Sequence, residues 1–348
     1  MCELFGLSAN IDVGVKISFK EFFEHSRIHR DGWGVGFYKD NVVVLFKEPK
    51  IAKESPLVEF IEKYDYVRSH IVISHIRRAS RGGVAYRNTH PFVREVFGRM
   101  WVFAHNGTLT GIRHRFSLRF YKPVGETDSE FAFCYILDKI RELGENNQDN
   151  LNLLYNVIQN AAAELDSLGK FNFLLSNGKY LFAYANRSGT LYYLQRYPPH
   201  TGEIVLRDKQ QRFTLSELKR NDEIVTLIAT TPLSNENWQE LPLSTLMVIE
   251  DGIIQTPMAT QTFESTEIKV LRFIREAPHR VFVRDIMRHL NLSFAETIKA
   301  LKNLRNKKLI RQDSRDAETG ARWNTMNASY YTMPSKREYI DSLLSKKQ

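Results

Sequence analysis

The first 263 residues form a series of short apolar segments separated by tight turns, and this series constrains the fold more than any other feature. The segments carry many β-branched and aromatic residues, which is typical of strands. They span residues 3–9, 42–46, 71–75, 100–105, 171–175, 180–185, 191–195, 224–229 and 245–254. Helical spacing is confined to residues 19–28, 56–64, 127–143 and 151–168, and it does not alternate with the strands as a βαβ repeat would. The sequence therefore predicts an α/β protein in which the sheets are largely antiparallel.

The charge of the chain is unevenly distributed. Residues 1–263 hold 31 Lys and Arg against 30 Asp and Glu, whereas residues 264–348 hold 18 against 10. The whole chain of 348 residues is 43% hydrophobic and 26% charged, which is typical of a globular protein with a substantial core. We therefore expect a main domain over residues 2–258, a small basic domain over 264–335 and a basic tail over 336–348.

Composition also disfavours several classes of protein. No apolar run approaches the roughly 18 residues of a membrane span, and the N-terminus has no basic leader, so we expect a cytoplasmic protein. The two cysteines, Cys2 and Cys134, are too few for a disulfide framework and lack the spacing of a zinc site. Cys134 lies in an apolar helical stretch and is expected to be inert core. No metal and no other cofactor is expected.

Cys2 directly follows the initiator methionine. Cysteine is small enough for Met1 to be trimmed, and trimming would leave a residue that carries both a thiol and an α-amine. The amine, with a pKa of about 7.7–8.0, could take the thiol proton directly or through water, so no separate histidine is required. The alternative is that Cys2 only starts a buried strand.

Asn106-Gly107 follows the apolar segment 100–105 and has two interpretations. The pair is among the strongest signals for a type I′ hairpin turn. Alternatively, the side-chain amide of Asn106 and the backbone N–H of Gly107 are two donors for a developing oxyanion. The two interpretations are compatible.

Residues 127–130 (Thr-Asp-Ser-Glu) fit a capping box, with Thr127 as the N-cap and Glu130 as its reciprocal partner. The box does not need Asp128. An acid in the first helical turn interacts favourably with the helix dipole, which would account for Asp128 as well. The alternative is that Asp128 binds a substrate ammonium.

Arg77 and Arg78 end a buried-looking strand and would ordinarily be solvated charge. An arginine there could instead hold a carboxylate through two parallel hydrogen bonds, because its planar guanidinium suits that task. His75, His90 and His105 are interpreted first as packing residues, since their spacing matches no metal motif.

Together these groups describe one reaction. A substrate held by an α-carboxylate (Arg) and an α-ammonium (Asp) would present a γ-carbonyl to a thiol beside an Asn/Gly oxyanion hole. Acyl transfer from glutamine needs these roles.

Five motifs resemble those of the class II glutamine amidotransferases, which are N-terminal-nucleophile hydrolases, and especially their small stand-alone members with a DGWG stretch. The motifs are the N-terminal Cys2, residues 75–80 (His-Ile-Arg-Arg-Ala-Ser), 88–91 (Asn-Thr-His-Pro), 105–107 (His-Asn-Gly) and 126–130 (Glu-Thr-Asp-Ser-Glu). They occur in the family's order, and the resemblance spans about residues 2–255. It implies a four-layer αββα sandwich with two mostly antiparallel sheets.

The resemblance also assigns roles to residues. It implies Cys2 as the nucleophile and Asn106 and Gly107 as the oxyanion hole. It implies that the substrate is bound by Arg77, Asp128, Ser80 and His90. Arg78 stands where the biosynthetic enzymes usually have Trp. No synthase-like or transferase-like region follows the matching part, so the resemblance leaves open a glutaminase, a subunit that feeds a separate synthase, or a hydrolase of another γ-glutamyl compound.

The basic region has its own pattern. Residues 267–276, 283–290 and a segment from Ser293 have helical spacing, and they are followed by two short apolar segments that flank a polar turn at 316–320. Three helices and a hairpin resemble a winged helix. If this domain binds DNA, its third helix would enter the major groove. The alternative is a solvated basic face or a protein-docking module.

The sequence thus supports two functions of different class. The first is a cysteine-dependent glutamine amidohydrolase whose C-terminal domain regulates it or recruits a partner. The second is a regulator that senses glutamine or a γ-glutamyl ligand and acts on DNA. Retention of the nucleophile together with the other site residues favours the enzyme.

Overall fold

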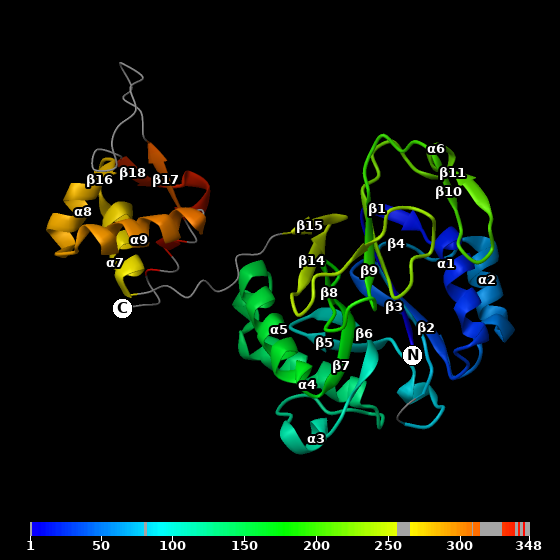
Figure 1. Cartoon of the computed structure of the whole chain (residues 1–348). Coiled ribbons are helices and arrows are strands. Elements are labelled where there is room, and N and C mark those ends of the chain that lie inside the picture. Colours follow the sequence, from blue (N-terminus) through cyan, green and yellow to red (C-terminus); the bar gives the residue numbers. More distant parts are fainter. Residues whose placement is uncertain are drawn as a thin grey trace. The chain divides into compact units, whose positions relative to one another are not determined.

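The computed structural model describes residues 2–79, 82–255, 265–307, 309–313, 329–337, 340–341 and 344. The chain forms two compact units, Met1–Ala259 and Thr260–Gln348 (Figure 1). Within the described residues, no helix is both long and apolar enough to cross a membrane.

The first unit is built on two large sheets. The seven-stranded sheet has the order β13-β9-β12-β1-β4-β2-β3. Its strands are β1 (Glu3–Gly14), β2 (Trp33–Lys39), β3 (Val42–Glu48), β4 (Arg68–Ile76), β9 (Tyr192–Arg196), β12 (Val225–Ala229) and β13 (Gln239–Glu240). The six-stranded sheet has the order β15-β14-β8-β7-β6-β5. Its strands are β5 (Phe92–Val96), β6 (Arg99–Leu109), β7 (Gly169–Ser176), β8 (Tyr180–Tyr184), β14 (Met247–Glu250) and β15 (Ile253–Gln255).

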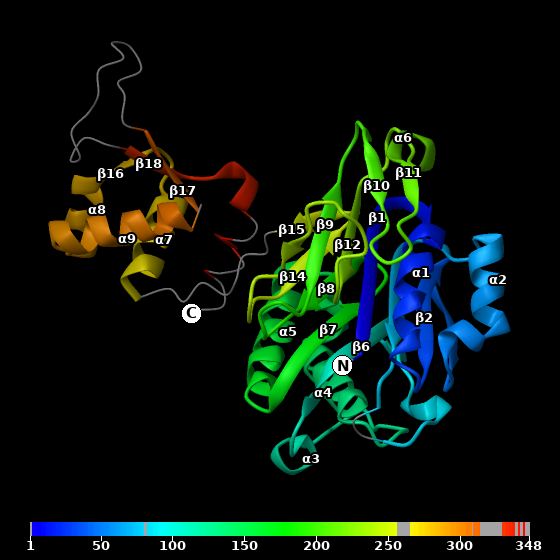
Figure 2. The same cartoon turned by 45° about the vertical axis from the view of Figure 1, so that its right-hand side comes forward.

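Helices cover the outer face of each sheet. The helices of the first unit are α1 (Lys16–Phe22), α2 (Pro56–Tyr64), α3 (Ile112–Arg115), α4 (Asp128–Glu142), α5 (Leu151–Asp166) and α6 (Leu215–Leu218). The pair α1 and α2 lies beside the seven-stranded sheet, and α4 and α5 lie beside the six-stranded one (Figure 1 and Figure 2). The strands β10 (Glu203–Val205) and β11 (Arg212–Thr214) form a separate two-stranded sheet. Helices, sheet, sheet and helices form the four-layer sandwich that the resemblance implied.

Strand alternation sorts apolar side chains into three cores. Leu4 belongs to the core between the two sheets, with Ile73, Val102 and Leu174. Its neighbour Phe5 faces the opposite way and packs with Phe19 under α1. A third core lies between the six-stranded sheet and helices α4 and α5. All strand pairs of the two sheets in the described part of the chain are antiparallel, which confirms the predicted α/β class.

Turn residues explain where the expected strands were right and where one was wrong. The hairpin between β2 and β3 turns at Asp40 and Asn41, which both have positive φ, as a type I′ turn requires. Residues 245–254, expected as one strand, are divided into β14 and β15. The turn at Asp251 and Gly252 also has positive φ at both residues, so it reverses the chain.

The plain-turn interpretation of Asn106-Gly107 is wrong. Strand β6 continues through both residues to Leu109, and Asn106 and Gly107 lie opposite Asn172 and Phe171 of β7. The local preference for a hairpin is overridden because β7 pairs along this whole stretch of β6.

The described residues of the second unit form three α-helices and a three-stranded antiparallel sheet. The helices are α7 (Ser265–Glu276), α8 (Val283–Leu290) and α9 (Phe294–Asn306). The sheet has the order β16-β18-β17, with β16 (Val281–Phe282), β17 (Ile310–Asp313) and β18 (Ser329–Thr332). Ser293 caps α9 in a capping box with Glu296. The expected polar turn at 316–320 lies outside the described residues.

Candidate active site

A cavity of about 280 Å³ brings Cys2 together with Asn106 and Gly107. Arg78, Ala79, Thr108 and Lys170 complete its lining. Cys2 enters from the residue before β1, the Asn-Gly pair from β6 and Lys170 from β7. The cavity therefore lies where the starts of β1 and β7 meet the end of β6. The Asn-Gly pair and Lys170, which are far apart in the sequence, share it because β6 and β7 pair in this register.

The Cys2 thiol contacts the backbone beyond β4. Its Sγ lies 3.3 Å from both the carbonyl oxygen and the amide nitrogen of Arg78. Burial raises the pKa of the Cys2 thiol, and the Arg78 amide and the Arg77 charge oppose that rise. The other cysteine, Cys134, is fully buried in α4, where burial raises its pKa to about 12. Cys2 is therefore the thiol that can meet a ligand.

The Asn-Gly pair is fixed by strand pairing on both sides. Asn106 is 3% exposed, and it lines the cavity together with Thr108, which lies two residues on and therefore on the same face of β6. A β-carbon at Gly107 would lie 1.8 Å from the carbonyl oxygen of Lys170 and 2.6 Å from Nε2 of His105. Only glycine fits at position 107. Its backbone can therefore approach both β7 and the cavity closely.

His105 is held inside the sheet and does not line the cavity. Its Nδ1 lies 2.8 Å from the hydroxyl of Ser129, and its Nε2 lies 3.3 Å from the Lys170 carbonyl. Burial lowers the pKa of His105. The imidazole is thus a neutral bridge between β6, β7 and the start of α4.

Arg77 is nearly buried and its guanidinium binds a neighbouring loop. Nη1 donates to the carbonyl of Gly83 and Nη2 to that of Gly82, both at 3.0 Å. The Arg77 backbone also exchanges hydrogen bonds with Asp31 and Gly32 of the DGWG stretch. The fork of Arg77 is therefore held by two loop carbonyl oxygens. Arg77 is not among the residues that line the Cys2 cavity, although its charge acts on the Cys2 thiol.

Asp128 is the first residue of α4 and binds backbone. Its Oδ2 accepts a hydrogen bond of 2.6 Å from the amide of Leu109, at the end of β6. Thr127 caps the helix as expected, accepting from the Glu130 amide. The expected return bond from Glu130 is absent from the described contacts. The Glu130 carboxylate instead accepts from the amides of Val124 and Gly125 and pairs with Arg94. The box is therefore only half formed, because a half-buried arginine and a loop compete for the carboxylate.

The remaining predicted site residues lie elsewhere. Ser80 lies outside the described residues. His90 is buried against His75, with ring centroids 4.2 Å apart, and does not line the Cys2 cavity. Burial lowers the pKa of His75 to about 3 and that of His90 well below its usual range. Both rings are neutral, and neither has a hydrogen-bond partner among the described residues.

Sequence reasoning missed Lys170. Lys170 lines the cavity because β7 places it opposite Thr108, which lines it too. Burial lowers the pKa of Lys170, while the negative charges of Glu3 and Cys2 oppose that change. The only sequence signal was its position at the start of an apolar strand. That position gives no register, so it could not have been assigned to the site.

Comparisons with known proteins agree on one family. Residues 1–271 match the family model described as "Glutamine amidotransferases class-II". The uncharacterized protein MJ1515 of Methanocaldococcus jannaschii is 38% identical over 355 residues, which cover 99% of this chain and 96% of that protein. YafJ of Escherichia coli, whose name marks it as a candidate glutamine amidotransferase, is 40% identical over 245 residues, covering 69% of this chain and 94% of its own.

A solved structure has the same architecture. The crystal structure of a predicted glutamine amidotransferase from Pseudomonas aeruginosa is 33% identical and has a TM-score of 0.55. The match covers 73% of this chain and all of that chain. The archaeal match must include the second unit, whereas the Escherichia coli match is too short to include both units in full.

Proposed function

The chain belongs to the class-II glutamine amidotransferases, and from this premise we propose that it hydrolyses the γ-amide of glutamine, or of a γ-glutamyl compound, through a thioester on Cys2. One observation carries the proposal. The Cys2 thiol and the two donors Asn106 and Gly107 line the same cavity. A nucleophile beside two oxyanion donors is the minimum that acyl transfer requires.

The reaction has two halves. Removal of Met1 frees the Cys2 amine, which takes the thiol proton as sulfur attacks the γ-carbonyl carbon. Asn106 and the Gly107 amide stabilise the tetrahedral oxyanion. The carbon–nitrogen bond then breaks, and the nitrogen leaves as ammonia, or as an amine, with the proton from Cys2. Water attacks the thioester, releases glutamate and restores the thiol.

Substrate binding is proposed for Arg77 and Asp128. The Arg77 fork now binds two backbone carbonyls, so the substrate carboxylate would replace the carbonyls of Gly82 and Gly83. Asp128 keeps one oxygen on the Leu109 amide, and its other oxygen would accept from the substrate ammonium. Ser80 and His90 stay proposals that rest on the family resemblance.

The test is glutamate release from glutamine by the Met1-processed protein. We expect release by the wild type and none by Cys2→Ala. Release of glutamate from a γ-glutamyl amide but not from glutamine would keep the mechanism and change the substrate. Equal release by Cys2→Ala and wild type would exclude the thioester.

Asn106→Ala tests the oxyanion hole separately. Removing one oxyanion donor typically lowers the rate by about 10²–10³, so turnover should fall by that factor while glutamine still binds. The expected signature is a reduced kcat with a nearly unchanged KM. Unchanged turnover would remove Asn106 from the reaction.

The destination of the ammonia is a separate proposal. A partner synthase would take it if the cavity opened onto that protein, and glutaminase activity would then be stimulated on mixing. The regulator alternative is supported by the order of the three helices and three strands that the described residues of the second unit form, which is that of a winged helix. It is also supported by exposed Lys299, Lys302 and Arg305 on α9. Lys307 contributes less, because it pairs with buried Glu267.

The DNA proposal is tested by salt. Phosphate contacts release counterions, so affinity for duplex DNA should fall steeply between low and moderate salt. Binding that is absent, or that does not change with salt, would leave the second unit as a protein-docking or regulatory module.

A further inference from the structure

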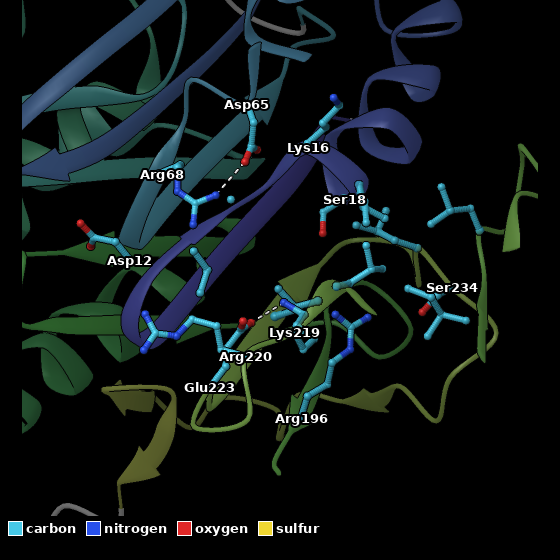
Figure 3. A pocket seen from close by; sticks show the side chains of 18 of the residues that line it. Asp12, Lys16, Ser18, Asp65, Arg68, Arg196, Lys219, Arg220, Glu223 and Ser234 are labelled. Atoms are coloured by element: carbon cyan, nitrogen blue, oxygen red, sulfur yellow. Dashed lines mark hydrogen bonds and ion pairs between the residues drawn. The ribbon is translucent and has the colours of Figure 1, made fainter. Parts of the chain in front are cut away.

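The structure has a second cavity, of about 240 Å³ (Figure 3). Its lining lies at the end of β1 that is opposite to Cys2. Asp12, Val13 and Gly14, at the end of β1, are among its lining residues. A strand rises about 3.3 Å per residue, so the two cavities are on the order of 30 Å apart. They have no lining residue in common. This cavity therefore has no part in the reaction at Cys2.

Two nearly buried ion pairs stand at one wall. Arg196, at the end of β9, binds Glu236 through Nε at 2.8 Å and through Nη2 at 2.5 Å. Lys219 binds Glu223. The side chains of the two cations are only 10% and 12% exposed. Burial lowers the pKa of Lys219, and the nearby Arg196 charge contributes to that lowering while Glu223 opposes it.

The carboxylate of Glu236 is itself held in place. It accepts a hydrogen bond of 2.6 Å from the hydroxyl of Ser234, which accepts one of 3.1 Å from the indole of Trp238. Ser234 and Trp238 both line the cavity. This chain of contacts fixes the orientation of the Arg196 guanidinium. Its Nη1, which does not bind Glu236, is therefore held in one position.

Both cations keep unused donors. Arg196 spends Nε and Nη2 on Glu236, and among the described contacts its Nη1 has no acceptor. Lys219 has three N–H donors and binds one carboxylate oxygen. Ser18 of α1 faces these two cations across the cavity, and in the described part of the chain its hydroxyl has no partner (Figure 3). Three residues with unused donors, from three parts of the fold, therefore line one cavity.

The charges and the surroundings indicate what would fill that space. Arg196 and Lys219 each already have one carboxylate, and Arg68 and Arg220 of the lining are paired with carboxylates as well. The lining therefore carries little net positive charge, so a single negative charge suits it better than a double one. Leu206, Leu227 and Leu233 supply apolar surface next to it. We propose that this cavity binds a small monocarboxylate with an apolar body, whose carboxylate accepts from Arg196, Lys219 and Ser18 and whose body packs on these leucines.

The probe is hexanoate, with hexanamide and inorganic phosphate for comparison, titrated calorimetrically into the full-length Cys2→Ala protein. Hydrogen bonds to a charged group should make hexanoate bind at least about tenfold more tightly than the amide. Phosphate should bind more weakly than hexanoate. Equal binding of hexanoate and hexanamide would overturn the proposal, as would tighter binding of phosphate or no detectable hexanoate binding by the folded protein.

Variants place the binding at this cavity. Replacing Lys219 alone would leave Glu223 buried without its cation, so the pair is removed together as Lys219→Met with Glu223→Leu. This double variant should lose at least about tenfold in hexanoate affinity, and Ser18→Ala should lose a smaller factor with the fold intact. The matched control is Lys139→Met with Glu142→Leu, a surface pair on α4, which should bind as before. An equal loss of hexanoate affinity in the control would refute the assignment. So would an unchanged hexanoate affinity in Ser18→Ala, or in the double variant.

Discussion

At the scale of single residues, Gly107 shows how tightly the candidate site is built. A β-carbon there would meet the Lys170 carbonyl at 1.8 Å, and backbone of a paired strand cannot move aside cheaply. We expect Gly107→Ala to lower the free energy of unfolding by about 3 kcal/mol or more and to abolish turnover. Chemical denaturation measures the first effect and glutamate release the second.

Gly83→Ala is the matched control for that experiment. A β-carbon at Gly83 meets nothing within 4 Å, and the carbonyl that Arg77 binds is retained. Its stability should stay within about 0.5 kcal/mol of the wild type. If Gly107→Ala proved as stable as Gly83→Ala, the close approach of β6 and β7 at this point would be wrong.

Cys2 makes a second prediction at this scale, because the Arg77 charge opposes the rise of its thiol pKa. A neighbouring cation favours the thiolate, so removing it in Arg77→Gln should raise the thiol pKa further. Alkylation of Cys2 by iodoacetamide at pH 8 should then slow, and its midpoint should move to higher pH. Arg99→Gln, which breaks a surface pair with Asp149, should leave both unchanged. Faster alkylation in Arg77→Gln would contradict the assigned electrostatics.

At the scale of elements, Glu3 anchors the start of β1 next to the nucleophile. His25 and His29 lie 3.6 and 3.4 Å from its carboxylate, and Thr230 donates to it. Burial works against ionisation, but these contacts lower the pKa of Glu3 to about 2. Contacts with Glu3 also raise the pKa of His25, against the opposing effect of its burial. One largely buried carboxylate therefore links β1 to the segment that follows α1.

The prediction concerns how Glu3→Gln changes stability with pH. A depressed carboxyl pKa stabilises the fold above the unfolded value of about 4.3, and that stability disappears as pH falls towards 2. The raised His25 pKa stabilises below about 6.5 and is lost as pH rises through the folded value. The free energy of unfolding of the variant should therefore be lower than that of the wild type by about 2 kcal/mol near pH 5.5. The difference should be smaller at lower and at higher pH. Denaturation at several pH values measures this, and a difference independent of pH would contradict it.

Elements were predictable where local signals and tertiary pairing agree. The helix over residues 56–64 has a proline in its first turn and a serine cap, and it forms with those bounds. Asn106-Gly107 has an equally strong local signal for a turn, yet both residues lie within a strand. The difference lies in β7, which the local sequence around Asn106 does not show. Local preference decides where no distant strand competes.

At the scale of the whole molecule, the difference between local signals and distant strand pairing also decides which residues of the site could be predicted from the sequence. Sequence reasoning could name Cys2, Asn106 and Gly107, because each belongs to a short motif whose own residues indicate the chemistry. Lys170 could not, since its place beside Cys2 depends on the register of β6 and β7. Sequence reasoning also could not predict that two loop carbonyls accept from Arg77. Every residue has a backbone carbonyl, so no residue type in the sequence marks these two.

The two units provide the last prediction. Buried Val270, Leu271, Ile286 and Leu304 belong to the second unit, and the three cores of the first contain none of them. Each unit thus has its own apolar interior, and the Cys2 cavity is lined by the first alone. A chain ending at residue 259 should therefore fold and release glutamate from glutamine at a rate within about threefold of the full chain, measured with Met1 removed from both. A shortened chain that folds but loses turnover would show that the second unit contributes to the reaction, and would make it the regulatory part of this enzyme.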